Sequence, residues 1–191
     1  MPKYGFSERP VGQSFNKEVP IGRWILHISF IDHESDFHVT ADVAIRVNAV
    51  EDLVHRGLGS PTTRSRTATI GAELGNIADH RQRRWAVTRS EEINAVVEAL
   101  VSEFKKFGLP YLQQYSDLKK MLDLLSPNDQ SAWLHAPIHL RRCMSAVALA
   151  VVLKDPRAAE IARAGERFLL ERKDPDLVSF KEFVMEVLGT S

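Results

Sequence analysis

His27 and Asp42 each lie in a segment where apolar and polar residues alternate, as in a strand. If the two strands pair, the two side chains could meet on the polar face and carry out acid–base chemistry. A carboxylate beside an imidazole orients the ring and raises its basicity, as a general base requires. One interpretation is therefore a small hydrolase or transferase that uses His27 and Asp42. The sequence specifies neither a nucleophile nor a metal ligand beside this pair, and polar pairs are also common on solvated sheet faces.

Potential metal ligands are concentrated between the two alternating segments. The candidates are His33, Glu34, Asp36 and His38. Imidazole nitrogens and carboxylate oxygens are ordinary zinc ligands, and hard cations take several oxygens. The segment has neither an EF-hand pattern nor a His-Glu-x-x-His motif, and a polar hairpin tip explains the same composition. The sequence predicts no resident metal or cofactor here.

A second histidine pair, His135 and His139, has the four-residue spacing that lets two side chains on one helix share a metal ion. Pro137 lies between them, so His135 is expected to precede the helix that carries His139. Packing at the helix entry, near Trp133, accounts for both histidines.

The segment from Arg56 to Arg89 is basic, with seven arginines against Glu73 and Asp79, a local charge of plus five. Its candidate partner-binding residues are Arg64, Arg66, Arg81, Arg83, Arg84 and Trp85. Guanidinium groups bind carboxylates and phosphates through paired N–H donors. The whole chain has 25 basic and 25 acidic residues, which argues against general attraction to nucleic acid. An acidic protein partner is the preferred interpretation, and a nucleic-acid binder is an alternative.

The elements that must position these residues form a hairpin. In the segments from Trp24 to Phe30 and from Phe37 to Val47, every second residue is apolar. This spacing predicts two strands with one apolar face each, because successive side chains of a strand point to opposite sides. A four-residue loop, His33 to Asp36, would oppose His27 and Asp42. A six-residue loop is also possible and would separate them.

The remaining pattern predicts an α+β fold in a single domain, 1–191. About five strands, mostly antiparallel, are expected in residues 1–89, and about five helices in residues 90–191. Gly108 and Pro110 should end the first of these helices, and Gly75 should lie in a turn or loop. The run from Ala146 to Val152 is apolar nearly all round, which is typical of a helix buried on several sides.

Several features are typical of a cytoplasmic protein. A single cysteine, Cys143, allows no internal disulfide, and the N-terminus has no apolar signal region. The longest apolar run, Ala146 to Leu153, is far shorter than the roughly 20 residues that span a bilayer.

The order of short motifs resembles a family of small bacterial proteins known as a domain of unknown function. The motifs are Gly5-Phe6, Ser14-Phe15-Asn16-Lys17, Gly22-x-Trp24-Ile25, Phe37 to Arg46, Arg83-Arg84-Trp85, Gly108 to Leu112 and Tyr115 to Leu118. Some members of that broad group are suspected to be immunity-like partners in toxin systems. The resemblance implies a binding protein and assigns no catalytic residues. We therefore expect a non-enzymatic protein that binds a protein partner through its arginine-rich surface.

Overall fold

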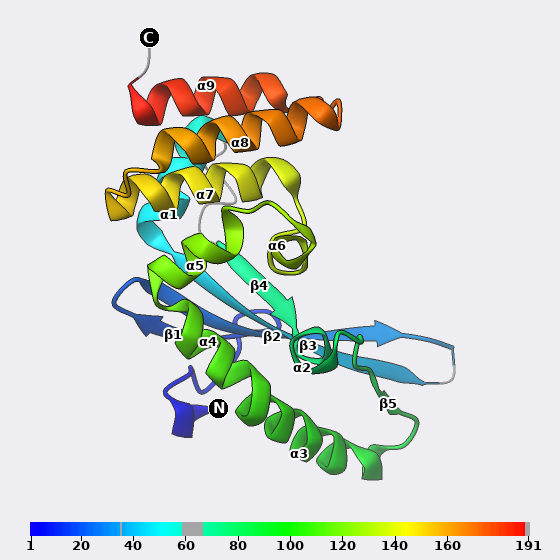
Figure 1. Cartoon of the computed structure of the whole chain (residues 1–191). Helices are drawn as coiled ribbons and strands as arrows, with labels where there is room; N and C mark the ends of the chain where they lie inside the picture. Colours follow the sequence, from blue (N-terminus) through cyan, green and yellow to red (C-terminus); the bar gives the residue numbers. More distant parts are fainter. Residues whose placement is uncertain (35, 59–66, 190–191) are drawn as a thin grey trace. The chain divides into compact units, whose positions relative to one another are not determined.

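The computed structural model describes residues 1–34, 36–58 and 67–189, and it has the predicted α+β fold (Figure 1). Its antiparallel sheet has the strand order β1-β2-β3-β4, and β5 pairs with β3 beside this path. The strands are β1 (Ser14–Val19), β2 (Gly22–Asp32), β3 (Phe37–Val47), β4 (Ile70–Glu73) and β5 (Trp85–Val87). The prediction of about five strands in the first ninety residues is confirmed.

Helices follow the sheet and also interrupt it. Before residue 90 these are η1 (Pro2–Tyr4), α1 (Asn48–Leu58) and α2 (Leu74–Asp79). After it come η2 (Ser90–Glu92), α3 (Ile93–Glu103), η3 (Phe104–Gly108), α4 (Leu109–Tyr115), α5 (Leu118–Leu125), α6 (Gln130–His135), α7 (His139–Leu153), α8 (Ala158–Glu171) and α9 (Leu177–Leu188). The expected C-terminal helical region is present.

The chain forms two compact units, each assembled from separate parts of the sequence. Unit 1 comprises residues 1–45 and 71–114, and unit 2 comprises residues 46–70 and 115–191. This division does not follow the predicted division into a sheet half and a helical half, because α1 lies in unit 2 and α3 in unit 1. The single domain remains a prediction.

The apolar face of the β2–β3 hairpin is buried in the core of unit 1. Leu26 and Val43 are fully buried, as the alternating pattern predicts. A Cβ atom built on Gly108 of η3 would lie 3.1 Å from Val43 Cγ1 and 2.9 Å from Leu74 Cδ2. Residues after the sheet therefore cover this apolar face, and glycine permits the close approach.

The helix after residue 90 continues past the point where the sequence predicts its end. Gly108 does not stop it: α3 passes into η3, a single turn of π-helix, and then into α4, which ends at Tyr115. Pro110, the second residue of α4, directly follows the π-helical turn and contributes no N–H to the continuous helix. The prediction of a break at Gly108 and Pro110 is wrong, because burial of Gly108 stabilises the continuous helix.

Other local predictions also need correction. Gly75 lies in helix α2 rather than in a loop, and a Cβ atom there would lie 2.2 Å from the carbonyl oxygen of Arg81. The short helix α6 was not predicted. Phe30, expected on the buried face, is 56% exposed because the hairpin extends beyond the core, where its ring contacts Phe37.

Helix α7 is the central element of unit 2. It packs against α1, α5, α8 and α9, and ten of its residues are buried, including Ala148 at 0% exposure. Figure 1 shows α7, α8 and α9 as three helices lying side by side. The prediction that the run from Ala146 to Val152 is buried on several sides is confirmed for its first five residues.

Gly108→Val should lower the free energy of unfolding by about 1–3 kcal/mol, because added atoms in a filled core force neighbouring side chains to move. Its Cβ atom would also lie 2.9 Å from Phe104 Cδ2. Urea unfolding followed by circular dichroism measures the change. Gln113→Val, on the exposed side of α4, is the control and should cost a few tenths of a kcal/mol. Equal stability of the two variants would contradict the described packing.

Candidate functional site

A row of polar side chains crosses the sheet of unit 1. Ser14 of β1 lies directly opposite His27 of β2, and the Ser14 Oγ to His27 Nδ1 distance is 2.8 Å. Asp42 of β3 interacts electrostatically with His27. All three side chains are half-buried. The structure thus joins the two residues named from the sequence to a serine that sequence reasoning missed.

The hairpin turn determines which residues of β2 and β3 face one another. The His33 N–H donates to the Asp36 carbonyl oxygen at 2.9 Å, which closes the four-residue loop considered from the sequence. The same register, continued along both strands, opposes His27 and Asp42. Ser14 could have been found in the same way, because a two-residue turn between Val19 and Gly22 fixes the β1–β2 register.

The environment of Asp42 disfavours its charged form. Burial raises the pKa of its carboxyl group, the nearby Glu73 carboxylate raises it further, and His27 acts in the opposite direction. Glu73, 7% exposed, accepts the backbone N–H groups of Asn76 at 3.1 Å and Arg83 at 3.2 Å. Like charges side by side are costly in a partly buried site, so Asp42 holds its proton more readily than an exposed aspartate.

The predicted partner-binding arginines have different surroundings. Arg64 and Arg66 lie outside the described residues. The Arg83 guanidinium contacts Asp79 Oδ2 and Glu103 Oε1, both at 3.2 Å, so carboxylates of unit 1 offset its charge. Arg81 and Arg84 are exposed, Arg84 donates to Gln82 Oε1 at 3.1 Å, and Trp85 is half-buried. Arg81 and Arg84 are thus the accessible arginines of this set within the part of the chain that the structure describes.

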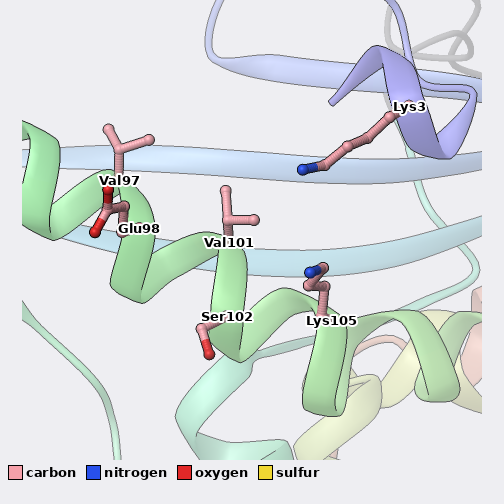
Figure 2. Close-up of a pocket in the computed structure, with 6 residues that line it drawn as sticks. All are labelled: Lys3, Val97, Glu98, Val101, Ser102 and Lys105. Atoms are coloured by element: carbon pink, nitrogen blue, oxygen red, sulfur yellow. The ribbon is translucent and has the colours of Figure 1, made fainter.

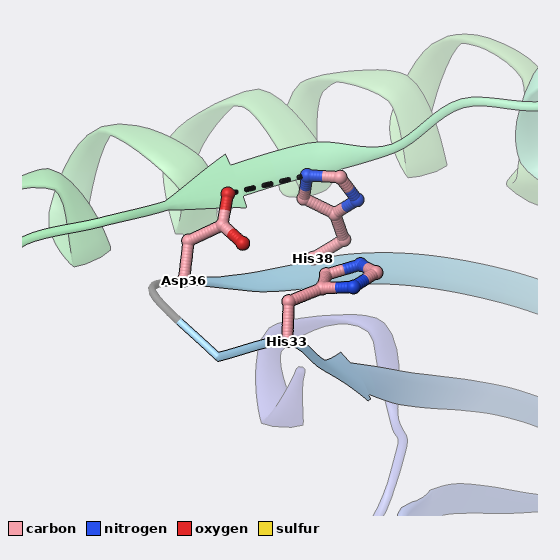
Figure 3. Close-up of side chains that lie close together, drawn as sticks. All are labelled: His33, Asp36 and His38. Carbon is pink, nitrogen blue, oxygen red and sulfur yellow. Dashed lines mark ion pairs between the residues drawn. The ribbon is translucent and has the colours of Figure 1, made fainter.

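Three of the four metal-ligand candidates converge at the hairpin tip. His33, Asp36 and His38 each offer a ligand atom, and these atoms lie within 4.8 Å of one another (Figure 3). Glu34 is exposed and does not belong to this group. His135 and His139 are not brought together: the His135 ring faces Tyr115, whereas His139 Nδ1 lies 3.3 Å from Asp174 Oδ2.

Sequence reasoning missed a buried charge cluster in unit 2. Glu51 of α1 is fully buried, and its Oε2 atom lies 2.7 Å from Arg141 Nη2 and 3.6 Å from Arg46 Nη1. Thr67 and Thr69 donate hydroxyl hydrogen bonds to the same carboxylate at 2.5 and 3.0 Å. A buried carboxylate with two guanidinium groups and two hydroxyl donors is compensated, so the cluster acts as a structural anchor.

A second missed group surrounds Arg142 of α7, which is fully buried. Its guanidinium donates to Asn128 Oδ1 at 2.6 Å and to the Ala136 carbonyl oxygen at 2.7 Å, and it lies 5.1 Å from the Phe168 ring centre. Burial lowers the pKa of Arg142. Arg172 lies 4.7 Å from the same ring centre. Phe168 of α8 and Arg172, the residue that caps its C-terminus, are four residues apart, but Arg142 comes from α7, so no local pattern indicates the whole stack.

Helix α3 borders an open hollow of about 340 Å³ (Figure 2). Its lining residues are Lys3, Val97, Glu98, Val101, Ser102 and Lys105. The rings of Tyr4 and Phe6 pack edge-on against Phe104 and hold the N-terminal segment beside the helix. Ile93 and Val97 of α3 are 45% and 53% exposed, and Leu100 is its one buried residue. Most apolar side chains of α3 are therefore exposed or only half-buried.

Comparison of the chain with family models, with curated proteins and with solved structures gives no match. Among the described residues, no helix combines the length and apolar character needed to cross a membrane. The function is therefore argued from this chain's own geometry.

Asp42→Asn should raise the melting temperature at pH 7, where it removes an ionised carboxylate that the folded state disfavours. The pKa of Asp42 in the folded protein lies above the ordinary value of 3.8. The carboxyl group therefore costs no stability below pH 3.8, and the cost is complete once the pH exceeds the folded pKa. The gain should vanish near pH 3. Differential scanning calorimetry at both pH values measures it.

Asp32→Asn, at the exposed end of β2, is the matched control and should change little at either pH. A destabilised Asp42→Asn variant at pH 7 would contradict the described environment of Asp42.

Proposed function

We propose that this chain is a non-enzymatic binding protein whose partner presents an acidic amphipathic helix to α3 of unit 1. The observation that carries the proposal is the exposure of apolar side chains along α3 beside two lysines. Ile93, Val97 and Val101 recur every four residues and form one strip about 12 Å long. Contiguous exposed apolar surface rimmed by polar groups is typical of interaction sites.

The charges around the hollow favour a partner that carries carboxylates. Lys3 and Lys105 contribute two ammonium groups, and Glu98 contributes one carboxylate. Figure 2 shows the Lys3 side chain reaching from the N-terminal segment toward α3. An amphipathic helix would place its apolar side chains against the valines and its carboxylates near the lysines, which is a recurring mode of peptide recognition.

The arginine-rich segment adds to the same proposal. β5 packs against α3, and the exposed Arg81 and Arg84 precede β5. Their positive charge would attract the same acidic partner. Nucleic acid is a weaker candidate because Arg83 and Arg89 already contact carboxylates of unit 1 and the whole chain has no net charge.

Lys105→Glu should weaken partner capture about three- to tenfold, because an exposed ion pair contributes up to about 1 kcal/mol and reversal replaces attraction with repulsion. Val101→Asp should weaken it at least as much. Each variant and the wild type, without a tag, are coupled to resin and used to capture proteins from a lysate of the source cells. Mass spectrometry then quantifies the captured partner. Arg81→Glu with Arg84→Glu tests the second part of the surface.

Lys106→Glu is the matched control, since Lys106 is exposed, does not line the hollow and carries the same charge change. A partner lost with Lys105→Glu and kept with Lys106→Glu supports the proposal, provided that its capture weakens as salt increases. Identical partner sets for all baits would overturn it.

A second candidate function is hydrolysis by Ser14, His27 and Asp42, favoured by the 2.8 Å distance between Ser14 Oγ and His27 Nδ1. His27 Nδ1 would accept the hydroxyl proton as Ser14 attacks an acyl carbon and would return it to the leaving group, after which water would release the acyl group from Ser14. It ranks second because the Ser14 N–H donates to the Val11 carbonyl oxygen at 3.2 Å. That N–H is therefore occupied and does not offer an oxyanion donor.

A fluorophosphonate probe tests this candidate without knowledge of a substrate, because it reacts with activated serines. If the hydrolase interpretation holds, wild type gains one adduct at Ser14, His27→Ala loses it, and Ser102→Ala, which changes an exposed serine, keeps it. Unlabelled wild-type protein would remove the hydrolase from consideration.

A further inference from the structure

We propose that His33, Asp36 and His38 bind one divalent transition-metal ion of the zinc type at the tip of the β2–β3 hairpin. The inference is independent of the proposed function, because the hairpin tip does not line the α3 hollow. It depends on the position of the three side chains, the contact between an imidazole nitrogen and a carboxylate oxygen, and the chemistry of the donor set.

The hairpin places its three ligands at fixed positions. His33 and Asp36 follow the end of β2 and precede the start of β3, and the His33 N–H hydrogen bond to the Asp36 carbonyl oxygen closes the turn. His38 is the second residue of β3, and its backbone pairs with Ala86 of β5. Edge-on contact between the Phe30 and Phe37 rings, 6.0 Å apart, braces the strands just before the tip.

The side-chain distances are close to those of a coordinated ion. His38 Nε2 lies 3.6 Å from Asp36 Oδ2, and the His33 and His38 ring centres are 4.8 Å apart. Figure 3 marks the first of these contacts with a dashed line. Ligand atoms about 2.0–2.1 Å from a tetrahedral zinc ion lie roughly 3.3 Å from each other. The histidine–aspartate pair needs only a small movement, and the exposed His33 ring can rotate to complete the site.

The contact between His38 and Asp36 already favours positive charge at this place. His38 Nε2 and Asp36 Oδ2 lie 3.6 Å apart, the arrangement of an ion pair when the ring is protonated. A metal ion would replace that proton, because neutral imidazole and carboxylate both donate electron pairs to zinc. His38 Nδ1 is buried and has no hydrogen-bond partner among the described residues, so no second group competes for the orientation of the ring.

The donor set determines which metals fit. Two imidazole nitrogens and one carboxylate suit zinc, copper, nickel and cobalt, whereas magnesium and calcium prefer all-oxygen sites. Three protein ligands leave a fourth tetrahedral position for water or for a group from a partner, unlike a closed structural site with four protein ligands. With one histidine exposed and two half-buried ligands, the site is accessible from solvent, so the metal would exchange.

Isothermal titration calorimetry of the tag-free full chain with Zn²⁺ should give one equivalent of binding. His33→Ala is the informative variant, because the exposed side chain can be removed without loss of folding. It should weaken binding at least about tenfold, since even groups that only support a metal ligand contribute that much. Asp36→Asn should weaken it in the same direction. Co²⁺ binding should give the intense visible absorption of tetrahedral coordination.

His80→Asn is the control, since His80 is exposed and has a φ of 60°, a conformation that asparagine tolerates. It removes one histidine elsewhere and should leave Zn²⁺ binding unchanged. Wild-type protein that binds no Zn²⁺ below 1 mM, or His33→Ala protein that binds as tightly as wild type, would overturn the proposal. Retained circular dichroism in each variant separates loss of the ligand from loss of the fold.

Discussion

The strict alternation of side chains along β2 and β3 is the constraint on which the arrangement of unit 1 depends. Leu26 and Val43 face the buried side, so His27 and Asp42 must face the other. The same parity places His38 on the face of Asp42. A shift of one residue between the strands would bury the polar row and expose the core, which gives the register a large energetic preference.

Local pattern was sufficient to predict the hairpin and the first five residues of the buried run of α7, and it offered the four-residue loop that opposes His27 and Asp42 as one of two possibilities. These features depend on residues close in sequence or on simple periodicity. Helix α3 was expected to end at Gly108, since glycine is a common stop signal. Its continuation follows from close packing against Val43 and Leu74, which belong to other elements. The position of Ser14 opposite His27 follows from the register between β1 and β2, which the two-residue turn at Pro20 could have indicated.

Among the described residues of unit 2, the charged side chains of Glu51 and Arg142 are fully buried and are stabilised in different ways. Glu51 has guanidinium and hydroxyl partners, whereas Arg142 donates to an amide and a carbonyl oxygen and lies against Phe168. Some partners are near in sequence, such as Ala136 for Arg142. However, Arg141 is 90 residues from Glu51, and Phe168 belongs to another helix than Arg142, so no local pattern predicts either environment. Buried charge of this kind contributes little net stability but penalises alternative packings that leave it unpaired.

The division of each unit between separate stretches of chain has a consequence for synthesis on the ribosome. The residues of unit 1 are all translated by residue 114, but Glu51 must wait for Arg141, which is 90 positions further on. At roughly 5–20 residues per second, the nascent helix carrying Glu51 lacks this counter-charge for roughly 5–18 seconds. During that interval, Val50 and Val54 of α1 also lack the cover that α7 later gives them.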